Sequence, residues 1–257
     1  YAPCPFNPIL GRKSVFSPVR RSGHGKPLQL PDGRWYMLYL CGRSVEGKTL
    51  MGRETALDPM AWTQDGWPMV NGLQGPSCLQ RLPFPDRADA LPSGEKWISP
   101  RGDPAAFARI REEETRLTAG ADPAGITPCS LLLRRQQEAA FSQEATVDLS
   151  EAGEGALGAL AGYYDERSFY LFGVRKDPDA LTLVLTEQIG PERTDRALAR
   201  VKGPAVRLAV RGAGLERRLC LMEDGREALA LSLRTEYLCD EGLSGGKRFT
   251  GALLGLA

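Results

Sequence analysis

Apolar residues recur at every second position along most of this 257-residue chain, in short runs that end at Gly, Pro, Asp or Asn. A period of two places successive side chains on opposite faces of a β-strand, and the turn residues join one strand to the next. Helical spacing is scarce. The chain is therefore predicted to be all-β.

Individual runs predict how each strand is buried. Residues 34–40, RWYMLYL, are apolar on both faces, so we expect this strand to be buried on both sides. Residues 206–212, VRLAVRG, alternate apolar side chains with arginines, which is typical of a sheet with one solvated face. Turn signals at Asp224-Gly225 and at residues 165–168 predict two hairpins.

A proline-rich stretch divides the chain. Five prolines interrupt any regular pattern between residues 83 and 104. We predict a front domain at residues 1–83, a linker at 84–104 and a β-sandwich at 105–257. About 80 residues are too few for a propeller or barrel of their own. We expect the front domain to begin before Tyr1.

Two local patterns leave more open. Residues 104–117 begin at Pro104 and are rich in helix formers, yet they lack a clean i, i+3, i+4 apolar face. A short helix and an irregular strand are equally compatible with them. The final GALLGLA ends within an apolar run. We therefore expect the sandwich to lack its C-terminal strand.

Charge and cysteine usage exclude several classes of protein. Lys and Arg number 33 against 32 Asp and Glu, without a sustained basic patch, which argues against nucleic acid and anionic membranes as partners. No apolar run approaches the roughly 20 residues that span a bilayer, and the N-terminus lacks signal-peptide features. Six scattered cysteines and one histidine make a metal site improbable. Reduced cysteines and a cytoplasmic location are expected.

Two polar side chains stand out in the front domain. His24, the single histidine, lies between two glycines before the 34–40 strand, and glycine lets the backbone approach a ligand closely. Arg43 follows that strand and offers a fork of donors to hydroxyls or a carboxylate. Taken alone, His24 is more simply a turn residue and Arg43 a solvated strand end.

The order of several short motifs adds to this interpretation. GHG, PDG, WYMLYL, LCGR, GRET and W-x-x-DGWP follow one another in the front domain. Together they resemble the last part of the five-bladed β-propeller of glycoside hydrolase family 43, the β-xylosidase and α-L-arabinofuranosidase group. LLLRRQQEAAFSQEATVDL, AGYYDERSFYLFGV and FTGALLGLA resemble the C-terminal concanavalin-like, lectin-like β-sandwich of the family's β-xylosidases.

The resemblance implies an inverting glycosidase, in which one carboxylate activates water and a carboxylic acid protonates the leaving oxygen. In the family these carboxylates, and a third that tunes the acid, precede the segment that matches Tyr1. No catalytic residue is therefore assigned in this chain. Glu54 is expected to pair with Arg53 or a neighbouring strand, Asp65-Gly66 to form a turn, and Asp58 to take no catalytic role.

The resemblance also implies three substrate-binding residues. His24 would lie near the propeller axis and Arg43 would reach into the sugar pocket. Phe249 would close the pocket from a loop of the sandwich, although a Phe that enters a strand is more often part of a core. Lys26 and Ser44 depart from the family pattern, in which an acidic residue and a proline are common there.

The predicted function is release of terminal xylose or arabinofuranose from xylo-oligosaccharides or arabinosides. No organic cofactor is required, and a structural Ca²⁺ and a homo-oligomer remain open. Trp62 and Trp67 are expected to be packing residues. One alternative is a carbohydrate-binding or interface module without catalytic activity, and another is a structural β protein that shares only the fold.

Overall fold

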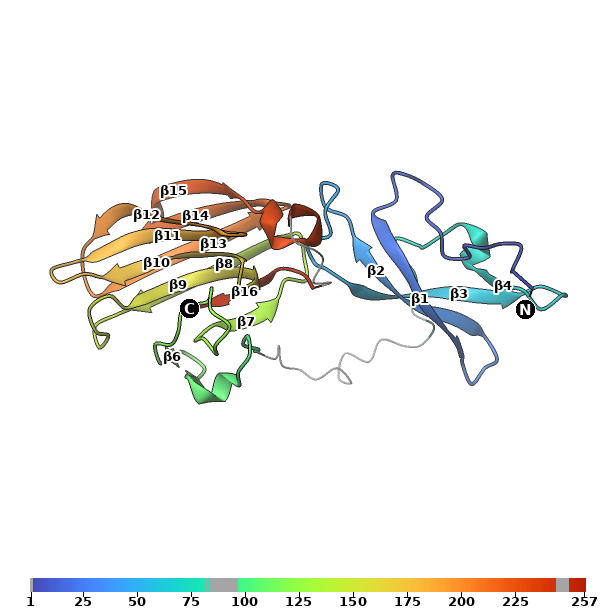
Figure 1. The fold of residues 1–257 in the computed structure, drawn as a ribbon, viewed down its shortest axis with the longest axis horizontal. Helices are drawn as coiled ribbons and strands as arrows, with labels where there is room; N and C mark the ends of the chain where they lie inside the picture. The colour runs from blue at the N-terminus through green and yellow to red at the C-terminus, as the bar shows by residue number, and fades with distance from the viewer. Residues whose placement is uncertain (1, 82, 84–96, 244–249) are drawn as a thin grey trace. The chain divides into compact units, whose positions relative to one another are not determined.

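A computed structural model describes residues 2–81, 83, 97–243 and 250–257. The chain forms two compact units, Tyr1–Ser93 and Gly94–Ala257 (Figure 1). Among the described residues every regular element longer than three residues is a β-strand. The all-β prediction is therefore confirmed.

The front unit is built on one antiparallel sheet of four strands in sequential order. Its strands are β1 (Val19–Gln29), β2 (Trp35–Arg43), β3 (Glu54–Trp62) and β4 (Pro68–Val70), and a 3₁₀ turn, η1 (Asn71–Leu73), follows. Four consecutive antiparallel strands are the form of a propeller blade.

One face of this sheet carries the front core. Met37, Tyr39 and Cys41 of β2 are buried on it, together with Leu10 and Val19 from the preceding part of the chain. The side chains that alternate with them point to the other face.

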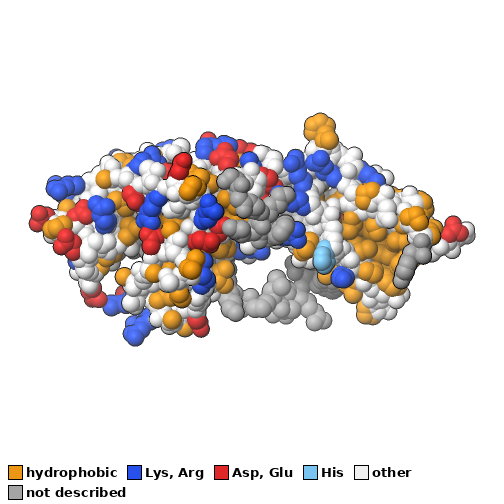
Figure 2. All heavy atoms as spheres, viewed as in Figure 1, with side chains coloured by type: hydrophobic (Ala, Val, Ile, Leu, Met, Phe, Trp, Pro, Cys, Tyr) orange, Lys and Arg blue, Asp and Glu red, His pale blue; other side chains and the backbone are white. Residues whose placement is uncertain are grey.

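The prediction that residues 34–40 are buried on both sides is wrong. Leu38 is 41% exposed whereas its neighbour Tyr39 is 2% exposed. The sequence shows that both faces of this strand are apolar, but it does not show whether other parts of the structure pack against each face. Figure 2 shows hydrophobic side chains gathered at the surface of the front unit.

The back unit is a sandwich of two antiparallel sheets (Figure 1). The larger sheet has the order β12-β11-β10-β9-β16-β7 and the smaller the order β15-β14-β13-β8. Gln143 Nε2 of β8 donates a hydrogen bond to the carbonyl of Gly255 in β16, which links the two sheets across the core at 2.7 Å.

The strands of the larger sheet are β7 (Leu132–Arg135), β9 (Leu157–Asp165), β10 (Ser168–Lys176), β11 (Leu181–Ile189), β12 (Glu192–Val201) and β16 (Leu253–Leu256). Those of the smaller sheet are β8 (Ala140–Asp148), β13 (Ala205–Ala213), β14 (Glu216–Glu223) and β15 (Arg226–Arg234). Two 3₁₀ turns, η4 (Glu236–Leu238) and η5 (Asp240–Gly242), follow β15.

Local sequence signals in this unit are confirmed. The predicted hairpins join β14 to β15 through Asp224-Gly225 and β9 to β10 through residues 166–167. Val206 and Val210 of β13 are buried whereas Arg207 on the opposite face is exposed.

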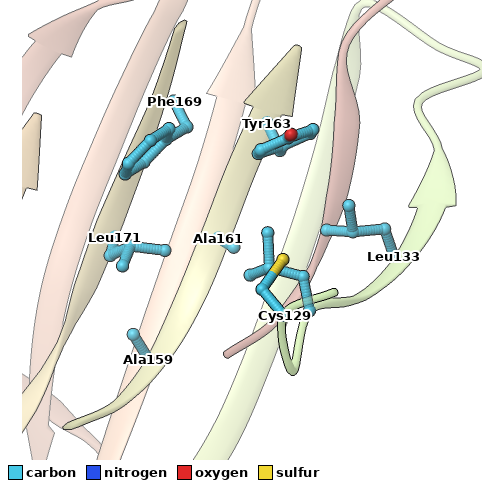
Figure 3. Packing of buried hydrophobic residues seen from close by; sticks show 8 residues of the cluster. Cys129, Leu133, Ala159, Ala161, Tyr163, Phe169 and Leu171 are labelled. Carbon is cyan, nitrogen blue, oxygen red and sulfur yellow. The ribbon is translucent and has the colours of Figure 1, made fainter. Parts of the chain in front are cut away.

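The larger sheet is also covered on its outer face. Tyr163 of β9 and Phe169 of β10 stack there with ring centroids 6.0 Å apart, beside Leu171, Ala161 and Cys129 (Figure 3). Cys129 belongs to the segment that precedes β7. The segment before the sandwich thus adds a second apolar layer to it.

The ambiguous segment 104–117 is mainly extended. One 3₁₀ turn, η3 (Pro104–Ala106), leads into a small hairpin of β5 (Ala108–Ile110) and β6 (Thr115–Leu117). All six cysteines are free thiols in the structure.

Candidate functional site

His24 lies at an irregular point of β1. The register of the β1–β2 ladder shifts between Arg20 and Gly23 and again between Gly23 and Lys26, so His24 belongs to the second bulge. Its φ angle is +54°, in the left-handed region that few residues other than glycine adopt. The bulge places the imidazole at the surface of the front unit (Figure 2).

The glycine after His24 has a packing role. A Cβ on Gly25 would lie 2.7 Å from Met37 Sδ and 3.2 Å from Leu10 Cδ1, both in the front core. Gly25 therefore lets β1 approach the core closely. His24, beside it in the bulge, is exposed.

Arg43 lies at the end of β2 and forms a bidentate ion pair with Glu54, the first residue of β3. Arg43 Nε lies 2.9 Å from Glu54 Oε2 and 3.1 Å from Oε1, and Nη2 lies 2.9 Å from Oε1. The side chains are 41% and 27% exposed. The expectation that Glu54 would find its partner on a neighbouring strand is confirmed.

The backbone beneath this pair is closely packed. A Cβ on Gly42 would lie 2.9 Å from Thr49 Cγ2 and 3.2 Å from the carbonyl of Gly52. Cys41 precedes Gly42 in β2. Burial of its thiol raises the pKa of Cys41 to about 11, and the charge of Glu54 is the second cause of this rise. The Cys41 thiol is therefore neutral at pH 7 and is no nucleophile.

His24 and Arg43 are carried by one two-stranded ladder but at different positions on it. Val19 opposes Arg43, and Gly23 opposes Leu40, three residues earlier on β2. Three residues of a strand span about 10 Å. One ligand that met both side chains would therefore have to extend along the strands.

The third predicted residue, Phe249, lies outside the described residues, so its role stays a prediction. The two tryptophans differ in exposure. Trp62 meets Trp35 edge-on with centroids 5.6 Å apart while remaining 44% exposed, and Trp67 is half-buried.

The other carboxylates of the front unit have structural environments. Asp58 is fully buried and accepts hydrogen bonds from the hydroxyl of Tyr39 at 2.6 Å and the amide of Ser77 at 3.1 Å. Asp65 lies in a turn that the amide of Gly66 closes onto the carbonyl of Thr63 at 3.0 Å.

Sequence reasoning missed the buried Asp58 and a second buried charge, Arg217 of the sandwich. Both had a signal in the alternation pattern. Asp58 shares a strand face with Met60, and Arg217 shares one with Leu219. A charged residue in phase with buried apolar residues indicates an internal hydrogen-bonding group.

Neither a metal-binding cluster nor a membrane-spanning helix occurs in the part of the chain that the structure describes. No three His, Cys, Asp or Glu side chains come together there in a way that could hold a metal ion. No helix in that part has the length and apolar character needed to cross a bilayer.

Each of the two units matches a known family model. Residues 1–68 match the family model described as "Glycosyl hydrolases family 43", and residues 92–257 match "Beta xylosidase C-terminal Concanavalin A-like domain". The chain is 26% identical to "Xylosidase/arabinosidase 43B" of Humicola insolens over 93% of its own length and 49% of that protein. Over 72 residues, 27% of its length, the chain is 43% identical to the "Non-reducing end alpha-L-arabinofuranosidase BoGH43B" of Bacteroides ovatus, of which this match covers 14%.

One solved structure is similar to this chain over its whole length. The GH43 protein BlXynB of Bacillus licheniformis superposes with a TM-score of 0.84 at 27% identity, covering 100% of this chain and 53% of that one. The chain thus spans about half the length of these long matches. With one unit matching the hydrolase model and the other the β-xylosidase C-terminal domain, the chain belongs to glycoside hydrolase family 43.

Proposed function

We propose that the protein containing this chain is a glycosidase that releases terminal xylose or arabinofuranose from xylo-oligosaccharides or arabinosides. The observation that carries the proposal is the match of both units, in order, to the two domains of xylosidase and arabinosidase relatives. The reaction follows the inverting route. One carboxylate deprotonates water while a carboxylic acid across the sugar protonates the leaving oxygen.

The acid and base belong, in this proposal, to a part of the protein that precedes Tyr1. The environments of Glu54, Asp58 and Asp65 support this assignment. Glu54 is paired with Arg43, Asp58 is buried with Tyr39, and Asp65 lies in a turn. Carboxyl groups of an inverter instead face each other across roughly 6.5–9.5 Å.

This chain would supply binding groups. Arg43 donates hydrogen bonds to hydroxyls of the sugar, and such donors accelerate the reaction when the bonds strengthen in the transition state. Because Glu54 balances its charge, the pair suits uncharged hydroxyls. His24 would lie beside the acid, and no step requires an organic cofactor or a metal.

A hydrolase is favoured over a carbohydrate-binding module by the aromatic residues of the back unit. Sugar-binding faces present exposed aromatic rings for stacking. In the described part of the back unit every Trp, Tyr and Phe is buried or half-buried.

The test is to express the complete open reading frame and assay aryl β-xyloside and aryl α-arabinofuranoside. Hydrolysis of either substrate, with the inverted anomer seen first by NMR, is expected. Purified residues 1–257 alone should release no sugar. Activity of that fragment would overturn the assignment of the acid and base, and glycan binding without turnover by the complete protein would favour the binding module.

A further inference from the structure

We propose that Glu54 is a positioning residue for Arg43: it fixes the orientation in which the guanidinium meets the sugar. The inference rests on the proposed function, because Arg43 must contact substrate for its orientation to affect turnover.

The contact geometry is that of an orienting clamp. Glu54 engages Nε and Nη2 together, at 2.9–3.1 Å. Pairing along this edge fixes the rotation of the guanidinium plane, since both donors are rigid parts of one fork. A lysine in place of Arg43 would offer a point charge with no plane to orient.

Both partners stand on a rigid base. Glu54 begins β3 opposite Cys41, and Cys41 is 5% exposed. Gly42, between Cys41 and Arg43, is buried against Thr49 and the carbonyl of Gly52 with no room for a Cβ. The bidentate pair therefore holds the guanidinium of Arg43 in a fixed position relative to the ends of β2 and β3.

The expected effect of Glu54 on the rate of turnover is larger than its expected effect on the free energy of folding. An ion pair with side chains 41% and 27% exposed contributes at most about 1 kcal/mol to folding. A misplacement of about 1 Å at a reacting centre can cost roughly 100-fold in rate. Loss of Glu54 should therefore appear in turnover far more clearly than in thermal stability.

The experiment compares Glu54→Gln, Arg43→Lys and the double variant in the complete protein, with an aryl xyloside or arabinofuranoside as substrate. Glu54→Gln keeps the side-chain shape and removes the charge. We expect kcat to fall about tenfold with KM changed less than twofold, because the lost contact is one that strengthens in the transition state. Melting temperature should stay within about 2 °C of wild type.

The double variant isolates the route through which Glu54 acts. If Glu54 acts only by orienting Arg43, then Glu54→Gln should cost almost nothing once Arg43 is Lys. An independent effect of Glu54, seen as the full tenfold loss on the Arg43→Lys background, would overturn the inference.

A matched control lies in the same unit. Asp32 also pairs with an arginine, Arg34, at 2.6 Å, and Asp32→Asn makes the same change of charge in the turn between β1 and β2. It should leave kcat/KM unchanged.

The remaining outcomes distinguish the two proposals. If Arg43→Lys lowers kcat/KM whereas Glu54→Gln leaves it within twofold, the positioning role is wrong and the proposed role of Arg43 stands. If Arg43→Lys leaves an active enzyme unchanged, both roles fail together.

Discussion

The hydroxyl of Tyr39 donates a 2.6 Å hydrogen bond to Oδ2 of Asp58, and both side chains are buried in the front unit. Burial is the main cause, and this bond to Asp58 the second, of a pKa of Tyr39 above its ordinary value. The phenol therefore keeps its proton and donates it in the hydrogen bond. Oδ2 also accepts the amide of Ser77. One buried carboxylate thus connects β2, β3 and the segment after η1.

Tyr39→Phe is expected to lower the free energy of unfolding by about 2 kcal/mol, because a buried carboxylate loses a charge-assisted hydrogen bond. Urea unfolding followed by tryptophan fluorescence measures this, since three of the four tryptophans lie in residues 35–67 of the front unit. Tyr36→Phe is the control. Tyr36 is half-buried, and its hydroxyl accepts a long hydrogen bond of 3.4 Å from Nη1 of Arg34. Equal losses for the two variants would contradict the prediction.

Gly162→Ala should destabilise the sandwich by about 3 kcal/mol through overpacking. A Cβ on Gly162 would lie 2.1 Å from Cε1 of Tyr170, a fully buried ring. The comparison is Gly153→Ala in a turn, where a Cβ meets nothing within 4 Å and the expected change is below about 0.5 kcal/mol. Differential scanning calorimetry of both variants checks the ranking, and a Gly162→Ala protein as stable as Gly153→Ala would refute it.

Arg217→Ala should cost about 3 kcal/mol or more. The fully buried Arg217 donates to the carbonyls of Gly214 and Glu216 and to Oε1 of Gln136, at 2.8–3.0 Å, so truncation leaves buried acceptors without donors. Its guanidinium also lies 4.9 Å from the centroid of the Phe141 ring.

The adjacent Arg218 supplies the control for this substitution. Arg218 is 53% exposed, and Arg218→Ala should cost less than about 1 kcal/mol in chemical unfolding at pH 7. A smaller loss for Arg217→Ala than for Arg218→Ala would show that the buried charge is not part of what holds the sandwich together.

Glu227 is expected to make the sandwich sensitive to acid. Its hydrogen bond with Arg218, reinforced by Cys220 and Arg211, lowers the pKa of Glu227 from 4.5 to about 2. A carboxylate with a lowered pKa stabilises the fold above its unfolded-state pKa. This stabilisation is lost as pH falls from about 4.5 to about 2.

Unfolding measured across that pH window tests this prediction. Wild type should be more stable than Glu227→Gln at pH 7, and the two should converge near pH 2. Glu223→Gln, at the exposed end of β14, should follow wild type throughout. A constant difference between wild type and Glu227→Gln across the window would rule out the linkage.

Much of the fold could be predicted because strands and turns have local sequence patterns. Alternation in 206–212 predicted which side of β13 is buried, and Asp224-Gly225 predicted the turn between β14 and β15. Ordered motifs carried the family assignment. Each of these signals spans only a few residues, so no knowledge of distant contacts is required.

The candidate site was only partly readable. The sequence singled out His24 and Arg43, but it did not predict that His24 lies in a bulge of the β1–β2 ladder. The choice of Glu54 as the partner of Arg43 depends on the register of β2 against β3. Register is set by the packing of whole strands, and no local pattern contains it.

From the residues alone the chain could be predicted to be all-β, two of its hairpin turns could be located, and its family could be inferred. The exposure of Leu38 beside the buried Tyr39, the burial of Asp58 and Arg217, and the pairing of Glu54 with Arg43 became clear only in the folded chain. Alternation in the sequence gives the chemistry of each face of a strand. Burial and charge pairing depend instead on which distant segment comes to lie against that face.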